Sequence, residues 1–328
     1  MSHQIKTLGV FTSGGDAPGM NAAIRAIVRS GLYHGCKIKG IRRGYQGMIE
    51  NEIIDLSNTS VSNIIQRGGT ILKTARSNEF LTVEGREKAY KNLCEHQIDA
   101  IVAIGGDGTF TGASVFMHEH PSIPFVGIPG TIDNDLSGTD FTIGFDTAIN
   151  TVVEAVDKIR DTAASHNRLF FIEVMGRDSG MIALNAGIGV GAEAILIPET
   201  TTYIDQLVHH LERGWKRKKS SYIIMVAEGD DTGGAEKVAS EVKKRFDEYD
   251  TRISILGHIQ RGGSPSCADR MLASRLGYEA VEALHRGKRG VMVGIVHQDV
   301  KLTPFEQAVR DQNKINVHLL KMAEILSL

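Results

Sequence analysis

Short apolar runs alternate with stretches of helical periodicity along the whole chain. The runs are rich in valine and isoleucine, and most end at glycine, proline or aspartate, as strands buried on both faces of a sheet do. The predicted strands are Thr7–Phe11, Lys37–Ile41, Ala100–Ile104, Phe125–Ile128, Arg168–Val174, Ala194–Ile197, Tyr222–Ala227 and Arg252–Leu256. This alternation predicts an α/β doubly wound fold with mainly parallel pairing.

Two predicted helices show a clear division into faces. Asn21–Leu32 gathers its apolar residues on one face and places Arg25 and Arg29 on the other, one turn apart. Thr147–Ala163 has a similar inward face of Ile149, Val152, Val153, Val156 and Ile159. Both stretches are therefore expected to pack an apolar face on a sheet.

The composition argues against nucleic acid and membranes as partners. The chain has 37 basic and 39 acidic residues, a near-neutral balance that gives no reason to expect a polyanion or a membrane surface. No signal peptide and no span of about 20 apolar residues is found. The 3 cysteines lack metal-ligand spacing, which is typical of reduced thiols. A cytoplasmic protein is expected.

Two glycine-rich turns follow predicted strands. In Thr12–Asn21, glycines let the backbone approach an anion, and the following helix adds N–H groups and a favourable dipole. This loop matches neither the P-loop nor the dinucleotide fingerprint. In Gly105–Thr109, Asp107 lies between glycines, where a carboxylate can hold Mg²⁺ beside a phosphate. The alternative for the first loop is a plain structural turn, and the alternative for Asp107 is a helix N-cap.

The segment Pro129–Asp135 carries two carboxylates just after a predicted strand. One of Asp133 and Asp135 can accept a hydroxyl proton while the other assists a metal; a general base contributes ~10²–10⁴ in rate. An Asx-turn pair that caps the next helix is the alternative. Because the carboxyl ends of parallel strands collect at one edge of a sheet, these aspartates and the glycine turns are expected to meet. The combination predicts phosphoryl transfer.

Basic residues at the ends of predicted elements indicate a second phosphate site, on the substrate. One such arginine alone is more often a solvated surface residue, whereas several at strand ends favour a ligand. They are Arg76, Arg168, Arg177, Arg252, His258 and Arg261.

In these segments the chain resembles the bacterial 6-phosphofructokinases, and the resemblance runs from its first strand to about Leu284. The resemblance implies two lobes, each a mainly parallel sheet flanked by helices. Residues 1–143 and 258–305 would form a larger ATP-binding lobe, and 144–257 a smaller sugar-phosphate-binding lobe. Residues 306–328 would form a tail that packs on the lobes, and the pattern from Pro304 onward is helical. The matching segments, in order, are Thr12–Asn21, Gly105–Thr109, Pro129–Asp135, Met175–Arg177 and Gly257–Pro265.

The reaction that the resemblance implies is transfer of the γ-phosphoryl group of Mg·ATP to the 1-hydroxyl of fructose 6-phosphate. The implied catalytic residues are Asp133 as the base, Asp135, Arg177, Thr131 and Gly15. The implied ATP-binding residues are Gly15, Arg76, Ser77, Gly106, Asp107, Gly108 and Thr109, with Asp107 holding Mg²⁺. The implied substrate-binding residues are Thr131, Ile132, Asp133, Arg168, Met175, Gly176, Arg177, Glu228, Arg252, His258, Ile259, Gln260 and Arg261.

Two glycines indicate the phosphoryl donor. Pyrophosphate-using relatives typically carry aspartate at the position of Gly108 and lysine at that of Gly130, so the resemblance implies ATP here. A pyrophosphate-dependent enzyme is the main alternative. A non-catalytic regulatory paralogue is disfavoured because the carboxylates and the arginine of the site are all present. A nicotinamide oxidoreductase is disfavoured because its fingerprint is absent.

The resemblance also implies a regulated homotetramer. Arg168 and Arg252 would act on the active site of a neighbouring subunit, and ADP and phosphoenolpyruvate would be the effectors. Asn58 stands where the family usually has arginine, and Ser220 and Ser221 replace basic or imidazole residues, so the identity and strength of the effectors stay open. The implied effector residues are Arg25, Arg29, Arg160, Gly191, Glu193, Arg217 and Lys219.

Overall fold

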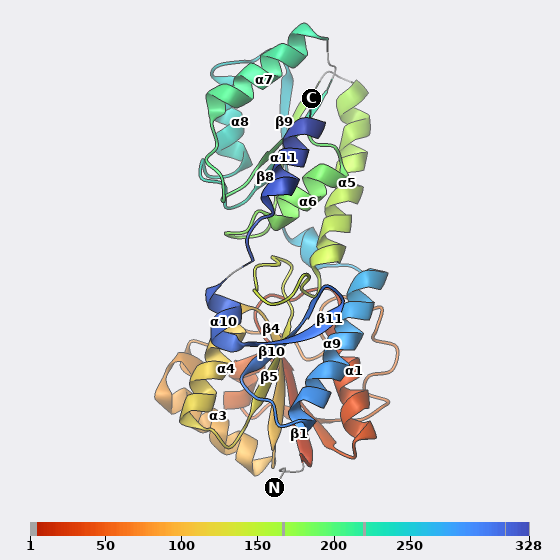
Figure 1. Cartoon of the computed structure of the whole chain (residues 1–328), viewed down its shortest axis with the longest axis vertical. Helices are drawn as coiled ribbons and strands as arrows, with labels where there is room; N and C mark the ends of the chain where they lie inside the picture. The colour runs from red at the N-terminus through yellow and green to blue at the C-terminus, as the bar shows by residue number, and fades with distance from the viewer. Residues whose placement is uncertain (1–4, 166–167, 219–220, 312, 328) are drawn as a thin grey trace. The chain divides into compact units, whose positions relative to one another are not determined.

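The computed structural model of the chain describes residues 5–165, 168–218, 221–311 and 313–327. The chain divides into two compact units and passes between them several times. Each unit has its own sheet, helices and core (Figure 1). The first unit comprises Met1–Ile132, Leu136–Thr147 and Arg261–Asn313, and the second comprises Asp133–Asp135, Ala148–Gln260 and Lys314–Leu328.

The first unit is built on a seven-stranded sheet. In spatial order its strands are β11 (Asp299–Pro304), β10 (Val291–Val296), β5 (Phe125–Pro129), β4 (Ala100–Gly105), β1 (Thr7–Thr12), β2 (Lys37–Ile41) and β3 (Ile53–Leu56). The inner strands pair in parallel, and only the edge strands β3 and β11 run antiparallel to their neighbours. Every residue of β1, β4 and β5 is buried, as their apolar sequences require.

Helices cover both faces of this sheet (Figure 1). On one face, α1 (Met20–Tyr33) packs along α9 (Cys267–His285). On the other lie α3 (Val83–Glu95), α4 (Asp107–Glu119) and α10 (Phe305–Arg310), with the short elements α2 (Gly44–Ile49) and η1 (Glu79–Leu81). Aromatic rings fill the core beneath this second group, among them Phe11, Phe80, Phe110, Phe116, Phe125 and Phe305.

A buried carboxylate of α9 holds the start of α5 (Phe145–Ser165). Asp269 accepts the N–H groups of Gly144 and Thr147 at 2.8 Å each, and the Thr147 hydroxyl at 2.5 Å. Asp269 is 1% exposed, and this burial raises the pKa of its carboxyl group. The N–H groups at the start of a helix lack partners within the helix, so this side chain satisfies them and is itself satisfied.

The second unit is built on a four-stranded parallel sheet. Its strands, in spatial order, are β7 (Ala194–Leu196), β8 (Tyr222–Ala227), β6 (Arg168–Val174) and β9 (Asp250–Ile255). The helices α7 (Ile204–Lys216) and α8 (Ala235–Lys243) lie on one face, and α6 (Met181–Gly189) and α11 (Val317–Leu326) on the other (Figure 1). The unit also holds most of η2 (Gly257–Arg261).

The predicted fold class is confirmed, and every predicted strand is present with its ends within about two residues of those expected. The helices predicted at Asn21–Leu32 and Thr147–Ala163 are present as α1 and α5. Three strands were not predicted. β3 has only 4 residues, and β11 mixes charged and apolar residues because it is an edge strand, whereas β10 carries an ordinary apolar run.

The helical pattern expected from Pro304 onward forms two helices. Of these, α10 belongs to the first unit and α11 to the second. Searching the described part of the chain reveals no helix with both the length and the apolar character needed to cross a membrane.

Candidate active site

The predicted loops of the first unit lie side by side at the carboxyl edge of its sheet. Parallel pairing places Gly105 of β4 opposite Pro129 of β5. The pairing continues past the strand ends, because the N–H group of Ser13 donates to the Ile104 carbonyl and that of Gly130 to the Gly105 carbonyl, at 2.9 Å each. The segments after β1, β4 and β5 are therefore neighbours where ligands bind in open α/β sheets.

The turn after β4 is crowded at one end and open at the other. A Cβ atom on Gly105 would lie 2.2 Å from Thr109 Oγ1 and 2.7 Å from the carbonyl oxygen of Ser13, so only glycine fits there. A Cβ atom on Gly108 would meet no atom within 4 Å. The open end leaves room for a ligand beside the start of α4.

Asp107 is the exposed first residue of α4. The N-cap residue of this helix is Gly106, so the alternative reading of Asp107 as an N-cap is wrong. A carboxylate here fits Mg²⁺, which is commonly bound through one or two carboxylates together with substrate phosphates. Within the ranges that the structure describes, no group of three or more His, Cys, Asp or Glu side chains is arranged to hold a metal, at Asp107 or at any other place.

The loop after β1 brings Gly15 against Arg261. A Cβ atom on Gly15 would lie 2.4 Å from Arg261 Nη1, and the same Nη1 donates to the Asp16 carbonyl at 3.3 Å. Gly14 has a φ of 80°, a left-handed conformation that suits glycine. The predicted phosphate loop therefore lies against Arg261, which is predicted to bind substrate.

The residues Arg76 and Ser77 follow a segment that is tied to the first motif. Asn21 is 1% exposed, and its amide exchanges hydrogen bonds with the backbone of residues 67–71. Ser77 Oγ donates to Gln46 Oε1 at 2.7 Å, while Arg76 is exposed. The guanidinium of Arg76 is thus accessible, and Arg76 lies five residues past the segment that Asn21 holds.

Thr131 and Ile132 continue from β5. A Cβ atom on Gly106 would lie 3.7 Å from Thr131 Cβ, so the turns after β4 and β5 touch at this point. The carbonyl of Thr131 accepts the Thr142 hydroxyl at 2.6 Å, and the residue is partly exposed. Ile132 is completely buried, so it would reach a substrate only through its backbone.

In the second unit, Asp133 and Arg177 form an ion pair. Arg177 Nε lies 3.6 Å from Asp133 Oδ2, and the side chain of Asp133 is 3% exposed against 51% for that of Arg177. Asp135 is partly buried. A nearly buried carboxylate beside an accessible guanidinium can take a proton from a substrate and counter negative charge in the same place.

The turn after β6 is held by Glu228 and Gln260. Glu228 Oε1 accepts the N–H groups of Gly176 at 3.2 Å and Arg177 at 2.8 Å. Gln260 is completely buried, and its Oε1 accepts the N–H group of Met175 at 3.3 Å. Gln260 would therefore act on a substrate only through Met175, whereas Glu228 is exposed.

Arg168 and Arg252 lie on the adjacent strands β6 and β9 and share one carboxylate. Asp250 Oδ2 is 3.1 Å from Arg168 Nε and 2.9 Å from Arg252 Nη2. Two cations around one carboxylate leave an excess positive charge, which favours an anionic ligand. His258 and Ile259 are exposed in the neighbouring η2.

Comparison with known proteins identifies the family of this chain. The family model described as phosphofructokinase matches residues 7–284. The chain belongs to the phosphofructokinase family. The ATP-dependent 6-phosphofructokinase 1 of Thermus thermophilus is 56% identical over 324 residues, 99% of this chain and 100% of that one. The ATP-dependent 6-phosphofructokinase 2 of Bacteroides thetaiotaomicron is 54% identical over 324 residues, 99% of each chain.

Solved phosphofructokinase structures share the fold. The phosphofructokinase from Saccharomyces cerevisiae matches with a TM-score of 0.89 and 38% identity over 93% of this chain and 45% of that one. This chain thus spans less than half of the yeast chain. A pyrophosphate-dependent phosphofructokinase from Marinobacter aquaeolei has a TM-score of 0.84 at 23% identity, over 96% of this chain and 86% of that one. That likeness concerns the fold alone.

The effector residues expected for this phosphofructokinase fall in both units. On α1, burial and then the nearby charge of Arg29 lower the pKa of Arg25. In the second unit, Arg160 Nη1 lies 3.9 Å from Glu193 Oε1, and Arg160 Nη2 donates to the Gly191 carbonyl at 3.2 Å. These guanidinium groups and the turn at Gly191 are compatible with an anionic effector.

The remaining expected effector residues surround the end of α7 and the segment after β3. Arg217 is exposed at the C-cap of α7. Lys219 and Ser220 lie outside the described residues. Ser221 is partly exposed, and Asn58 is exposed.

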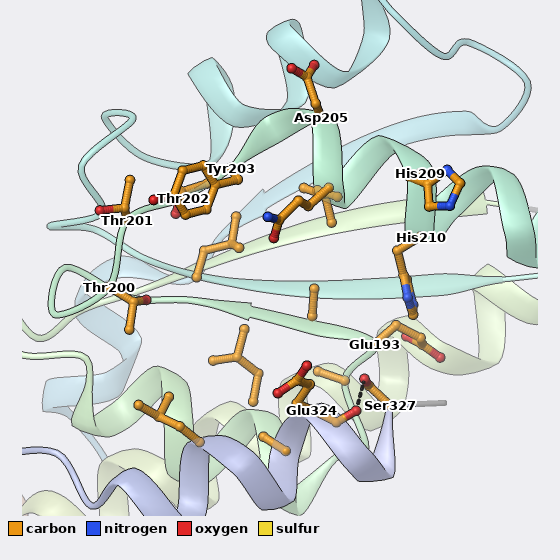
Figure 2. A pocket seen from close by; sticks show the side chains of 18 of the residues that line it. Glu193, Thr200, Thr201, Thr202, Tyr203, Asp205, His209, His210, Glu324 and Ser327 are labelled. Atoms are coloured by element: carbon orange, nitrogen blue, oxygen red, sulfur yellow. Dashed lines mark hydrogen bonds between the residues drawn. The ribbon is translucent and has the colours of Figure 1, made fainter.

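A hollow of about 760 Å³ lies beside Glu193 in the second unit. Figure 2 shows that its walls come from β7, α7 and α11, with Thr200 near one end and His210 near the other. None of the predicted catalytic or substrate-binding residues lines it. The hollow was not predicted from the sequence, and of the expected effector residues that the structure describes it shares only Glu193.

Three residues that contact the predicted site were not identified in the sequence. Ser179 follows Arg177 closely in a glycine-flanked segment, and this position was a usable signal. Glu199 and Asp250 gave no such signal. Their contacts with the turn after β6 and with Arg168 depend on strand pairing within the second unit.

A pair of alanine substitutions tests the packing of the turn after β4. Gly105→Ala is expected to lower the free energy of unfolding by about 1–3 kcal/mol, because the new methyl group overlaps Thr109 and Ser13. Gly108→Ala enters open space in the first turn of a helix, so the change is expected to stay below about 1 kcal/mol. Urea unfolding followed by circular dichroism measures both, and equal losses would contradict this packing.

Proposed function

We propose that this protein is an ATP-dependent 6-phosphofructokinase of glycolysis. It transfers the γ-phosphoryl group of ATP to the 1-hydroxyl of fructose 6-phosphate and releases fructose 1,6-bisphosphate and ADP. The observation that carries this function is 54–56% identity, over 99% of the chain, to enzymes named ATP-dependent 6-phosphofructokinase. A cytoplasmic location goes with this glycolytic role, and detection of the protein in cell fractions tests it.

ATP is proposed to bind at the carboxyl edge of the first unit's sheet. Open space at Gly108 and the N-terminus of α4 suit a polyphosphate, because the N–H groups of the helix point toward it. Gly15 would donate its N–H group to the transferring phosphate. The other proposed contacts are Arg76, Ser77, Gly106, Asp107, Gly108 and Thr109.

Asp107 would hold the Mg²⁺ ion that accompanies ATP. Its exposed carboxylate at the start of α4 supplies the hard oxygen ligand that Mg²⁺ prefers. When bound, Mg²⁺ neutralises charge on the phosphate oxygens. Asp135 is proposed to support both the metal and the base.

Asp133 is proposed as the general base that takes the proton of the sugar's 1-hydroxyl. Its carboxylate is nearly buried and lies beside Arg177, so it is held in one place and shielded from bulk water. Arg177 would counter the charge that develops on the transferring group, an arginine role worth ~10³–10⁵ in related reactions. Thr131 would position the γ-phosphate.

The sugar phosphate is proposed to lie among Arg168, Arg252, His258 and Arg261. Its hydroxyl groups would donate to Glu228, with the turn at Met175 and Gly176 closing the pocket. The proposed assembly is a homotetramer in which Arg168 and Arg252 serve the active site of a neighbouring subunit. The excess positive charge around Asp250 supports a phosphate ligand at these two arginines.

A coupled assay with fructose 6-phosphate and Mg²⁺ tests the donor. Turnover is expected with ATP and not with pyrophosphate, because the open space at Gly108 leaves room for a nucleotide. Turnover with pyrophosphate would keep the chemistry at Asp133 and overturn the donor. No turnover with either would favour a non-catalytic paralogue.

Asp133→Ser tests the proposed base. Turnover is expected to fall by about 10²–10⁴-fold, while the half-saturating fructose 6-phosphate concentration changes little. Steady-state kinetics measure both, and Asp157→Ser, an exposed aspartate on α5, is the matched control. A mild loss in the Asp133 variant would remove this residue from the role.

Regulation and assembly are tested together. Phosphoenolpyruvate is expected to raise the half-saturating fructose 6-phosphate concentration and ADP to lower it, with the Arg160→Ala variant less responsive to both. Sedimentation velocity is expected to give a tetramer. Fructose 6-phosphate saturation curves that do not change with either effector would contradict the proposed regulation. A monomer at every concentration would contradict the proposed sharing of active sites between subunits.

A further inference from the structure

The turn that follows β6 lies next to the proposed base, and two of its residues have positive φ angles. Gly176 has a φ of 146° and Arg177 a φ of 52°. A residue with a side chain adopts this left-handed conformation at a cost of roughly 1–3 kcal/mol. In the segment that the turn contacts, Asn134 has a φ of 51° and is completely buried. Such backbone persists only where neighbouring groups hold it.

Carboxylates hold both ends of this turn. Glu228 accepts the N–H group of Arg177 at 2.8 Å. The Glu199 carboxylate accepts the N–H group of Gly180 with both oxygens, at 2.9 and 3.2 Å. These charge-assisted hydrogen bonds are stronger than neutral ones, so the residues between the two anchors have a well-defined position.

Ser179 lies between these anchors and contacts the backbone of the base. Its N–H group donates to the Gly176 carbonyl at 2.9 Å, which closes the turn on itself. Its hydroxyl donates to the Asp133 carbonyl at 3.0 Å. Ser179 is 8% exposed and Asp133 is 2% exposed, so water competes little for this hydrogen bond.

The turn and the Asp133 segment are therefore joined by two different links. The Arg177 side chain faces the Asp133 carboxylate, with 3.6 Å between Nε and Oδ2, whereas Ser179 holds the Asp133 main chain. The ion pair contacts the end of the side chain, and the hydrogen bond from Ser179 holds the main chain from which the side chain extends. Together they help to define where the carboxylate lies.

We propose that Ser179 is a positioning residue for Asp133, which it orients for proton transfer through the hydrogen bond to the Asp133 carbonyl. This inference rests on the proposed function, because it takes Asp133 as the general base. A base must lie within hydrogen-bond reach of the proton that it takes, and a misplacement of about 1 Å can cost ~10²-fold in rate. Ser179 itself is not proposed to touch either substrate.

The first test compares three single variants in the ATP and fructose 6-phosphate assay. Ser179→Ala is expected to lower kcat by about 10–100-fold and to leave both KM values unchanged, because the binding groups stay in place. Ser179→Thr keeps the hydroxyl and is expected to retain most of kcat. Ser165→Ala is the matched control, because the exposed Ser165 also donates to a backbone carbonyl, that of Asp161, at 3.0 Å.

A double-mutant cycle with Asp133→Ser separates positioning from general stability. If Ser179 acts through the carboxylate of Asp133, then adding Ser179→Ala to Asp133→Ser is expected to leave the residual kcat unchanged. A purely structural role would lower kcat by the same factor in both backgrounds.

The outcomes separate this inference from the proposed function. A wild-type protein without turnover would overturn both. An active wild type whose kcat is unaffected by Ser179→Ala would overturn this inference alone, as would equal losses in the alanine and threonine variants. If Ser179→Ala does not fold, Ser179→Cys, of similar size but with a weaker donor, replaces it, and the same comparisons decide.

Discussion

Parallel pairing of β1, β4 and β5 is the constraint on which the proposed ATP site depends. In a parallel ladder, the segments that follow the strands emerge at one edge, and here the ladder continues one hydrogen bond into each loop. The bonds from Ser13 to Ile104 and from Gly130 to Gly105 bring the three loops together. A slip of one residue would turn every side chain of a strand to the opposite face, and the fully buried strands make such a slip costly.

In the second unit, the proposed base and the arginine beside it lie on or next to backbone with positive φ angles. Arg177 and Asn134 both have left-handed conformations, and residues that do no chemistry themselves hold the segments around them. Glu228 and Glu199 anchor the turn, and Ser179 joins it to Asp133. Strain of this kind is common at functional sites because it fixes side chains in directions that regular elements do not provide.

Much of the fold and of the site could be predicted from local pattern. Apolar runs that end at glycine or aspartate correctly located the parallel strands, and the same strand ends pointed to Gly105 and Asp133. The edge strand β3 was missed because it is short. The resemblance implies that Gln260 contacts substrate, but its complete burial against Met175 is not visible in the sequence, because burial depends on what packs over a residue.

The sequence by itself determined the fold class, the order of the loops and the family, because hydrophobic periodicity and glycine-rich turns are local properties of the chain. Only the tertiary structure decided which residues support the site. The contact of Gly15 with Arg261, the sharing of Asp250 by two arginines and the hold of Ser179 on Asp133 join residues far apart in the chain. Such contacts arise from strand register and packing, which no local pattern encodes.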